Sequence, residues 1–162
     1  MSYRIGQGYD VHQLKPELPL ILGGVTISHH KGIEAHSDGD ILVHSIIDAI
    51  LGACHLGDIG KLFPNNSETQ NMNGLSMLKS IKSRLDNLDG HFSIQNIDAT
   101  IILQSPKLST YIELMEKNIC KSLGLQYGHV SIKATTTDYL GFIGKEEGIA
   151  CLAVCICKKE KA

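Results

Sequence analysis

The chain has 162 residues, of which 43% are hydrophobic and 20% are charged, and its formal net charge is −2. This length and composition are typical of one globular domain (residues 1–162) that buries its own core without disulfides. The balanced charge and the absence of a visible signal peptide or membrane-spanning run argue against nucleic-acid or membrane partners and predict a cytoplasmic protein.

Apolar periodicity and turn residues predict the following elements. In chain order they are strands at about 3–8 and 20–27, helices at 39–54 and 74–88, a strand at 92–103, a helix between Pro106 and Gly124, and strands at 130–136 and 149–156. Asp38 or Asp40 can cap the first helix, and a glycine-containing loop at 56–64 follows it. This order predicts an α/β fold of the α+β type, with helices packed on one face of a mixed sheet. The core would be modest, so an oligomer would help to bury the rest.

Five cysteines are present, and none belongs to a Cys-x-x-Cys pair. Cys151, Cys155 and Cys157 share one parity in an apolar run, which places them on one face of a strand. They could be buried free thiols or metal ligands, and buried thiols in a reducing compartment are the preferred interpretation.

Two segments near the amino terminus carry metal-binding side chains. Asp10 and His12 are two residues apart, so on an extended segment they point the same way. Asp40, His44 and Asp48 recur every four residues and form one helical stripe. Two histidines and a carboxylate would leave an open position on zinc, as catalytic sites require, and Asp48 could orient the His44 ring. The alternative interpretation is an exposed polar face with a histidine that binds nothing.

A third segment carries hydroxyl groups. Lys133 is followed by three threonines at positions 135–137 and by Asp138, and the residues at 104–107 form a turn that ends in a lysine. The threonines could simply reflect β propensity. Hydroxyls, cations and a carboxylate together are also typical of a site for phosphate and a divalent cation. The combination predicts a polyphosphate ligand.

Taken in order, these motifs resemble those of 2-C-methyl-D-erythritol 2,4-cyclodiphosphate synthases over nearly the whole chain. The matching segments are Gly6–His12, Ala35–Asp40 with His44, Gly57–Pro64, Lys133–Thr136 and Gly148–Cys151. The resemblance implies a homotrimer with active sites between subunits and a step of the non-mevalonate isoprenoid pathway. The substrate would be 4-diphosphocytidyl-2-C-methyl-D-erythritol 2-phosphate, which is cyclised with release of CMP.

The resemblance also implies roles for individual residues. Asp10, His12 and His44 would bind one Zn²⁺, and Asp138 would bind a second divalent cation, Mg²⁺ or Mn²⁺. His36 and Thr136 would support the transition state, and Phe63 to Ser67 would form a mobile loop. Substrate contacts are expected at Asp10, His12, His36, Ser37, Asp58, Gly60, Phe63, Ser67, Leu103, Lys107, Thr135, Thr136, Thr137, Asp138, Phe142 and Lys145.

The chain departs from the family pattern at two positions. The family usually has glutamate where Asp138 stands, and the shorter side chain must move its backbone or bind the cation through water. The family often has arginine where Lys145 stands near the trimer axis, and lysine lacks the planar guanidinium fork for anions. Two rival functions remain open: a zinc phosphodiesterase that hydrolyses the diphosphate, and a trimer that binds the ligand without turnover.

Overall fold

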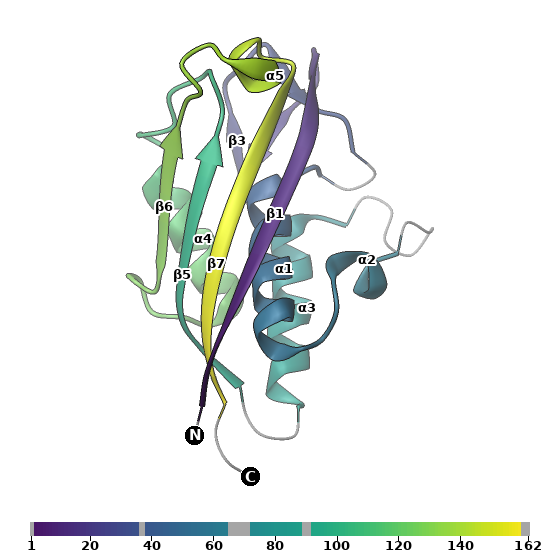
Figure 1. Ribbon diagram of the computed structural model, residues 1–162, viewed down its shortest axis with the longest axis vertical. Helices are drawn as coiled ribbons and strands as arrows, with labels where there is room; N and C mark the ends of the chain where they lie inside the picture. Colours follow the sequence, from purple (N-terminus) through teal and green to yellow (C-terminus); the bar gives the residue numbers. More distant parts are fainter. Residues whose placement is uncertain (1, 36–37, 65–71, 89–91, 160–162) are drawn as a thin grey trace.

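A five-stranded mixed sheet carries the helices on one face (Figure 1). The computed structural model describes residues 2–35, 38–64, 72–88 and 92–159. The sheet order is β4-β1-β7-β5-β6, and a separate two-stranded sheet pairs β2 with β3. The strands are β1 (Ser2–Pro16), β2 (Leu20–Leu22), β3 (Val25–Ile27), β4 (Lys31–Ile33), β5 (Phe92–Ile102), β6 (Val130–Thr135) and β7 (Gly148–Lys159).

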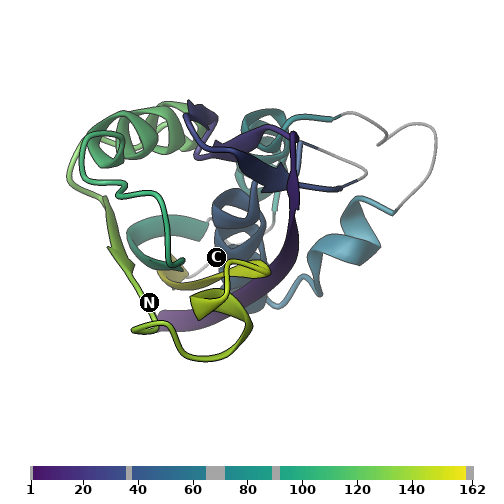
Figure 2. The ribbon, with the colours of Figure 1, turned by 90° about the horizontal axis from the view of Figure 1, so that it is seen from above.

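The helices are α1 (Ile41–Cys54), α2 (Ile59–Leu62), α3 (Gly74–Asp86), α4 (Ile112–Leu123) and α5 (Gly141–Gly144). The longer helices α1, α3 and α4 form the layer behind the sheet, and the single-turn helix α2 lies outside that layer (Figures 1 and 2). Only β5 and β6 are parallel, whereas the other pairings in the sheet are antiparallel. The predicted mixed sheet with helices on one face is therefore confirmed.

Several predicted boundaries were wrong. β1 continues past Gly8 to Pro16, because its pairing with β7 is unbroken from Ser2 to Gln13 and Leu14–Pro16 then pair with β4. The strand expected at 20–27 is a hairpin, since Gly23 and Gly24 both adopt positive φ and turn the chain. The helix expected from Pro106 begins only at Ile112, because the preceding residues form a turn anchored by the buried Leu108. Strand β4 and the short helices α2 and α5 were not predicted.

Asp40 fixes the start of α1. Its carboxylate is completely buried and accepts hydrogen bonds from the N–H groups of Gly23 (2.9 Å), Gly24 (2.7 Å) and Val43 (3.2 Å). Burial raises the pKa of Asp40 to about 6, although the three donors stabilise the ionised form. The cap thus ties the first turn of α1, which carries His44, to the β2–β3 hairpin.

Helix α1 lies directly against the inner face of β1. A Cβ atom at Gly8 would lie 1.9 Å from the carbonyl oxygen of Ser45, and one at Gly6 would lie 1.9 Å from that of Ala49. No side chain fits there, so the two glycines allow the helix backbone to touch the strand. This contact sets the distance between His44 on α1 and Asp10 on β1.

The Gly8→Ala variant should lower the free energy of unfolding by about 3 kcal/mol or more, because the methyl group must push α1 away from β1. Urea unfolding followed by circular dichroism measures the change. Gly52→Ala is the matched control, since a Cβ there would meet its nearest neighbour, Gly6 Cα, at an ordinary 3.8 Å. The control should be unchanged or up to ~1 kcal/mol more stable, as alanine favours a helix. An equally stable Gly8→Ala protein would contradict the close contact.

The burial of the thiols agrees with the preferred interpretation. All five cysteines are free and buried, and Cys151, Cys155 and Cys157 lie on the face of β7 that points toward the helices.

None of the described helices has the length and apolar character needed to cross a membrane.

Candidate active site

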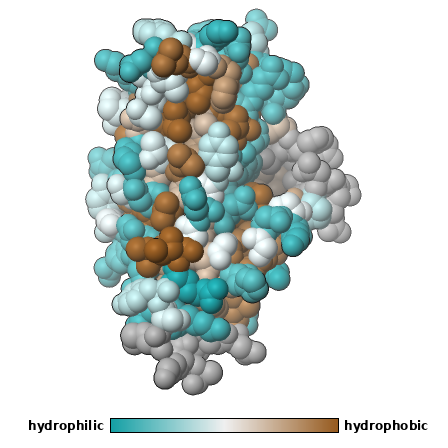
Figure 3. Space-filling view, viewed as in Figure 1, coloured by the Kyte–Doolittle hydropathy of each residue, from teal (hydrophilic) through white to brown (hydrophobic). Residues whose placement is uncertain are grey.

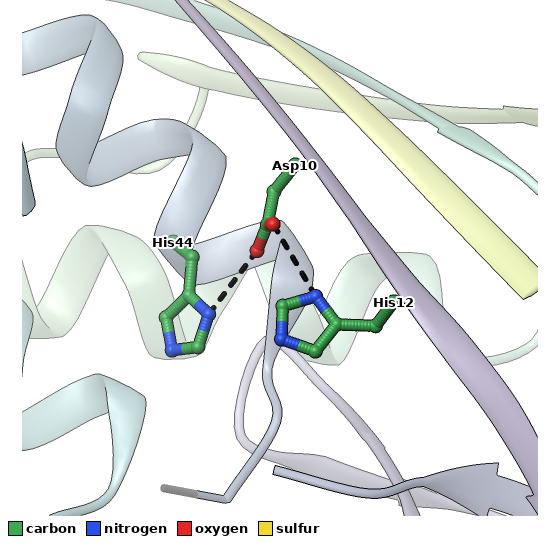
Figure 4. Close-up of side chains that lie close together, drawn as sticks. All are labelled: Asp10, His12 and His44. Carbon is green, nitrogen blue, oxygen red and sulfur yellow. Dashed lines mark hydrogen bonds and ion pairs between the residues drawn. The ribbon is translucent and has the colours of Figure 1, made fainter. Parts of the chain in front are cut away.

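Asp10, His12 and His44 come together between β1 and α1 (Figure 4). Asp10 and His12 lie on the inner face of β1, and His44 extends from the first turn of α1. Asp10 Oδ2 is 3.2 Å from His44 Nδ1, and Asp10 Oδ1 is 3.3 Å from His12 Nδ1. The two imidazole rings are 5.8 Å apart between centroids. We call these three residues the triad.

The electrostatics of the triad favour a charged carboxylate. Burial alone would raise the pKa of Asp10, but the neighbouring His12 and His44 outweigh it and hold that pKa well below its usual value. Burial alone would lower the pKa of His44, but the Asp10 carboxylate outweighs it and raises that pKa. Asp10 is therefore ionised at neutral pH and ready to bind a cation.

The donor atoms of the triad fit a zinc ion. One ligand atom from each residue lies within 4.8 Å of the other two. His12 Nδ1 is buried and, apart from its 3.3 Å ion-pair contact with Asp10, has no hydrogen-bond partner within the described part of the chain. Two imidazoles and one carboxylate are a common ligand set of catalytic zinc, which keeps a fourth position open. The triad can thus hold zinc with a position left for substrate.

The loop after α1 borders the triad. Asp48 lies one turn beyond His44, and its Oδ1 accepts a hydrogen bond from the N–H of Ile59 at 2.7 Å. Asp48 therefore holds the start of α2. Asp58 caps the same helix by accepting the Lys61 N–H at 2.9 Å. Of the expected substrate contacts in this region, Asp58, Gly60 and Phe63 lie in or beside α2, whereas His36, Ser37 and Ser67 lie outside the described residues.

A second group of expected contacts forms a separate pocket where β5 and β6 end. The lining residues are Leu103, Gln104, Pro106, Lys107, Leu108, Ser109, Ile112, Ala134, Thr135 and Thr136. The exposed Lys107 and the threonine hydroxyls make its rim polar, and Leu103 and Leu108 give it an apolar floor. Lys133, expected beside the threonines as a phosphate ligand, instead pairs with Asp98 on β5.

The turn after β6 carries Asp138. Thr136 Oγ1 lies 3.4 Å from Asp138 Oδ1, and Asp138 adopts a positive φ of 50°, which aspartate tolerates better than most residues. Gln104 belongs to the turn at 104–107 that was expected near a polyphosphate, but its specific contact was not predicted: its Oε1 accepts the Tyr139 N–H at 3.0 Å and ties the turn after β6 to the pocket. Its position in the turn after β5 was the only signal in the sequence. Phe142 and Lys145 lie farther on, in α5 and at its end.

A family model described as the YgbB family matches residues 3–158 of this chain. The chain belongs to the YgbB family. The 2-C-methyl-D-erythritol 2,4-cyclodiphosphate synthase of Clostridium botulinum strain Kyoto is 54% identical over 154 residues, which cover 94% of this chain and 98% of the relative. The family expected from the sequence motifs is thereby confirmed, and so is the expected synthase activity, a lyase reaction of the non-mevalonate isoprenoid pathway.

Two solved structures resemble the fold of this chain closely. The IspF of Plasmodium falciparum in its CDP complex is 37% identical, with a TM-score of 0.85, and the match covers 99% of this chain and 98% of that one. The bifunctional IspDF of Campylobacter jejuni is 43% identical, with a TM-score of 0.91 over 98% of this chain. The chain spans 42% of the length of that bifunctional protein.

Proposed function

We propose that this YgbB-family synthase works as a homotrimer whose active sites each combine groups from two subunits. The reaction converts 4-diphosphocytidyl-2-C-methyl-D-erythritol 2-phosphate into 2-C-methyl-D-erythritol 2,4-cyclodiphosphate and CMP. The triad of one subunit would hold the erythritol end of the substrate. The pocket beside Thr135 and Lys107 of the next subunit would hold the cytidine diphosphate, the nucleotide bound in the P. falciparum complex.

The sheet order is the observation that carries this proposal. The triad lies along β1 and the pocket at the end of β6, and β7 and β5 separate those two strands. Three interstrand spacings amount to about 14 Å. Zinc at the triad and the cation at Asp138 would both have to reach the diphosphate of one substrate, which is short compared with that width. The separation supports a site that combines the triad of one copy with the pocket of another.

The outer face of the sheet supports an oligomer. Tyr3, Ile5, Tyr9 and Val11 alternate along β1 on the side away from the helices, and Val154 of β7 lies on the same face. Tyr3 and Ile5 are 66% and 71% exposed, and Figure 3 shows brown, apolar side chains gathered over these strands. An exposed apolar face of this kind is typical of a surface that another copy covers.

Metal ions would assist the reaction without a covalent intermediate. Zinc at the triad, when bound, would polarise a phosphate oxygen as a Lewis acid, and Mg²⁺ or Mn²⁺ at Asp138 would neutralise the diphosphate. The 2-phosphate oxygen attacks the β-phosphorus and CMP leaves, so the nucleophile is already anionic and needs no side-chain base. The chain's own residues would therefore act by holding donor and acceptor in line.

The remaining predicted roles are part of the same proposal. His36 and Thr136 would stabilise transition-state charge by hydrogen bonds. Ser37, Asp58 and Gly60 would contact the erythritol end, with Phe63 and Ser67 in the adjoining loop. Further substrate contacts are expected from Thr137, Phe142 and Lys145. The single synthase domain at 1–162 and the cytoplasmic location stay predictions.

Subunit complementation tests the shared site. His44→Ala lacks a triad ligand but keeps the pocket, and Asp138→Ala keeps the triad. Each variant alone should be nearly inactive, whereas trimers refolded from an equal mixture should regain about a quarter of wild-type turnover, because a quarter of their sites combine two intact halves. CMP release measures the recovery.

The matched control mixes His44→Ala with Asp10→Ala, since both lack the triad and no mixed site can be complete. That mixture should stay inactive. If the first mixture also shows no gain over its separate components, each subunit must contain a complete site and the proposal is wrong.

A further inference from the structure

A second group of metal-binding side chains lies where β1 ends and β7 begins. His29 and His30 lie in the link between β3 and β4, and Glu146 lies in the turn between α5 and β7. One ligand atom of each lies within 4.8 Å of the others, and His30 Nε2 is 3.8 Å from Glu146 Oε2. The two imidazole rings are 4.3 Å apart between centroids. Segments far apart in the sequence thus bring three ligands together.

One buried polar atom of this group is not satisfied by the protein alone. His29 Nε2 is buried and has no hydrogen-bond partner among the described residues. A buried imidazole nitrogen without a partner costs free energy, so a group that binds to it is expected. The His30 side chain is 67% exposed, which leaves a path for an ion and for a water ligand.

The backbone at Glu146 does not favour a glutamate. Its φ is +55°, a conformation in which glycine is the unstrained residue. The N–H of Glu146 bonds to the Ile143 carbonyl at 2.9 Å, and Lys31 Nζ donates to the Glu146 carbonyl at 2.7 Å. These main-chain contacts hold the turn whatever side chain it carries. The glutamate is therefore explained better by what its carboxylate binds than by the turn.

We propose that His29, His30 and Glu146 bind a second zinc ion, separate from the ion at the triad. Two imidazoles and a carboxylate suit a borderline divalent cation, and water from the exposed side would complete a tetrahedron. The ion would clamp the link before β4 to the turn before β7. Lys31 Nζ lies 4.0 Å from Glu146 Oε2, and its charge opposes the cation, so this site binds zinc more weakly than the triad.

Zinc counting in four chains tests the site. The apoproteins are dialysed against micromolar Zn²⁺ and then digested, and their zinc content is measured by elemental mass spectrometry. Wild type should hold two ions per chain, Glu146→Gly one, His44→Ala one, and the double variant none. Glu146→Gly suits the test because glycine fits the positive φ and the turn stays folded. In addition, Zn²⁺ should raise the Tm of His44→Ala but not that of the double variant.

His129→Ala is the matched control, since it removes a partly exposed histidine outside both groups and should leave two ions bound. One ion in wild type and none in His44→Ala would overturn the second site. Two ions in Glu146→Gly would also overturn it, because the extra ion would then lie elsewhere. Two ions in His44→Ala with one in Glu146→Gly would support this site while contradicting zinc at the triad.

Discussion

Replacing His44 with alanine should remove zinc from the triad and lower CMP release on the order of 10³-fold. Only Asp10 and His12 would remain as ligands, and two ligands hold zinc too weakly. The wild-type His44 ring lies beside them, with its Nδ1 3.2 Å from Asp10 Oδ2. Metal content after dialysis and a coupled assay of CMP release measure the two effects. His129→Ala keeps the triad and should keep both the zinc there and the turnover. Near-normal turnover in His44→Ala would contradict the zinc assignment.

The second large effect is expected from Ile5→Glu. Ile5 lies in the middle of the exposed apolar face of β1, and a charge buried there between subunits would lack a partner. The variant should sediment as a monomer in analytical ultracentrifugation and lose most of its turnover, because the triad no longer meets a pocket from another copy. Its circular dichroism spectrum should stay that of the wild type.

Leu114→Glu is the matched control for this surface. Leu114 is 50% exposed but lies on α4, on the opposite side of the sheet, so the same charge should leave the trimer and its activity unchanged. A monomeric Ile5→Glu protein with full turnover would show that one subunit contains a complete site. A trimeric one would show that another surface holds the subunits together.

Local features of the site could be predicted from the sequence. Asp38 or Asp40 was predicted to cap α1 from the apolar helical pattern that follows, and the structure shows Asp40 in that role through the Val43 N–H. The two-residue spacing of Asp10 and His12 and the helical position of His44 indicated which side chains point the same way. Both predictions depend on periodicities of 2.0 and 3.6 residues, which are properties of the local backbone.

Long-range features could not be predicted in this way. β1 was expected to end near Gly8, but its pairing with β7 continues to Gln13 and its pairing with β4 extends it to Pro16. The separation of the triad from the threonine pocket depends on the strand order, which no residue pattern specifies. The close approach of α1 to β1 was also missed, because a glycine in a strand shows no sign of which backbone it touches.

The residue resemblance supplied what periodicity lacked. It joined segments as distant as His44 and Asp138 into one expected site, and the family assignment agrees with it. The main departure from the family pattern is the shorter carboxylate at Asp138. Asp138 has a positive φ, and the N–H of the next residue, Tyr139, donates to Gln104.

Analysis of the reaction products tests the central claim most directly. The protein is incubated with 4-diphosphocytidyl-2-C-methyl-D-erythritol 2-phosphate, Zn²⁺ and Mg²⁺, and the products are identified by mass spectrometry. Attack by the 2-phosphate on the β-phosphorus predicts CMP and the 2,4-cyclodiphosphate in equal amounts. A linear 2,4-bisphosphate, one water heavier than the cyclic product, would mean that water is the nucleophile and that the chain hydrolyses the diphosphate instead.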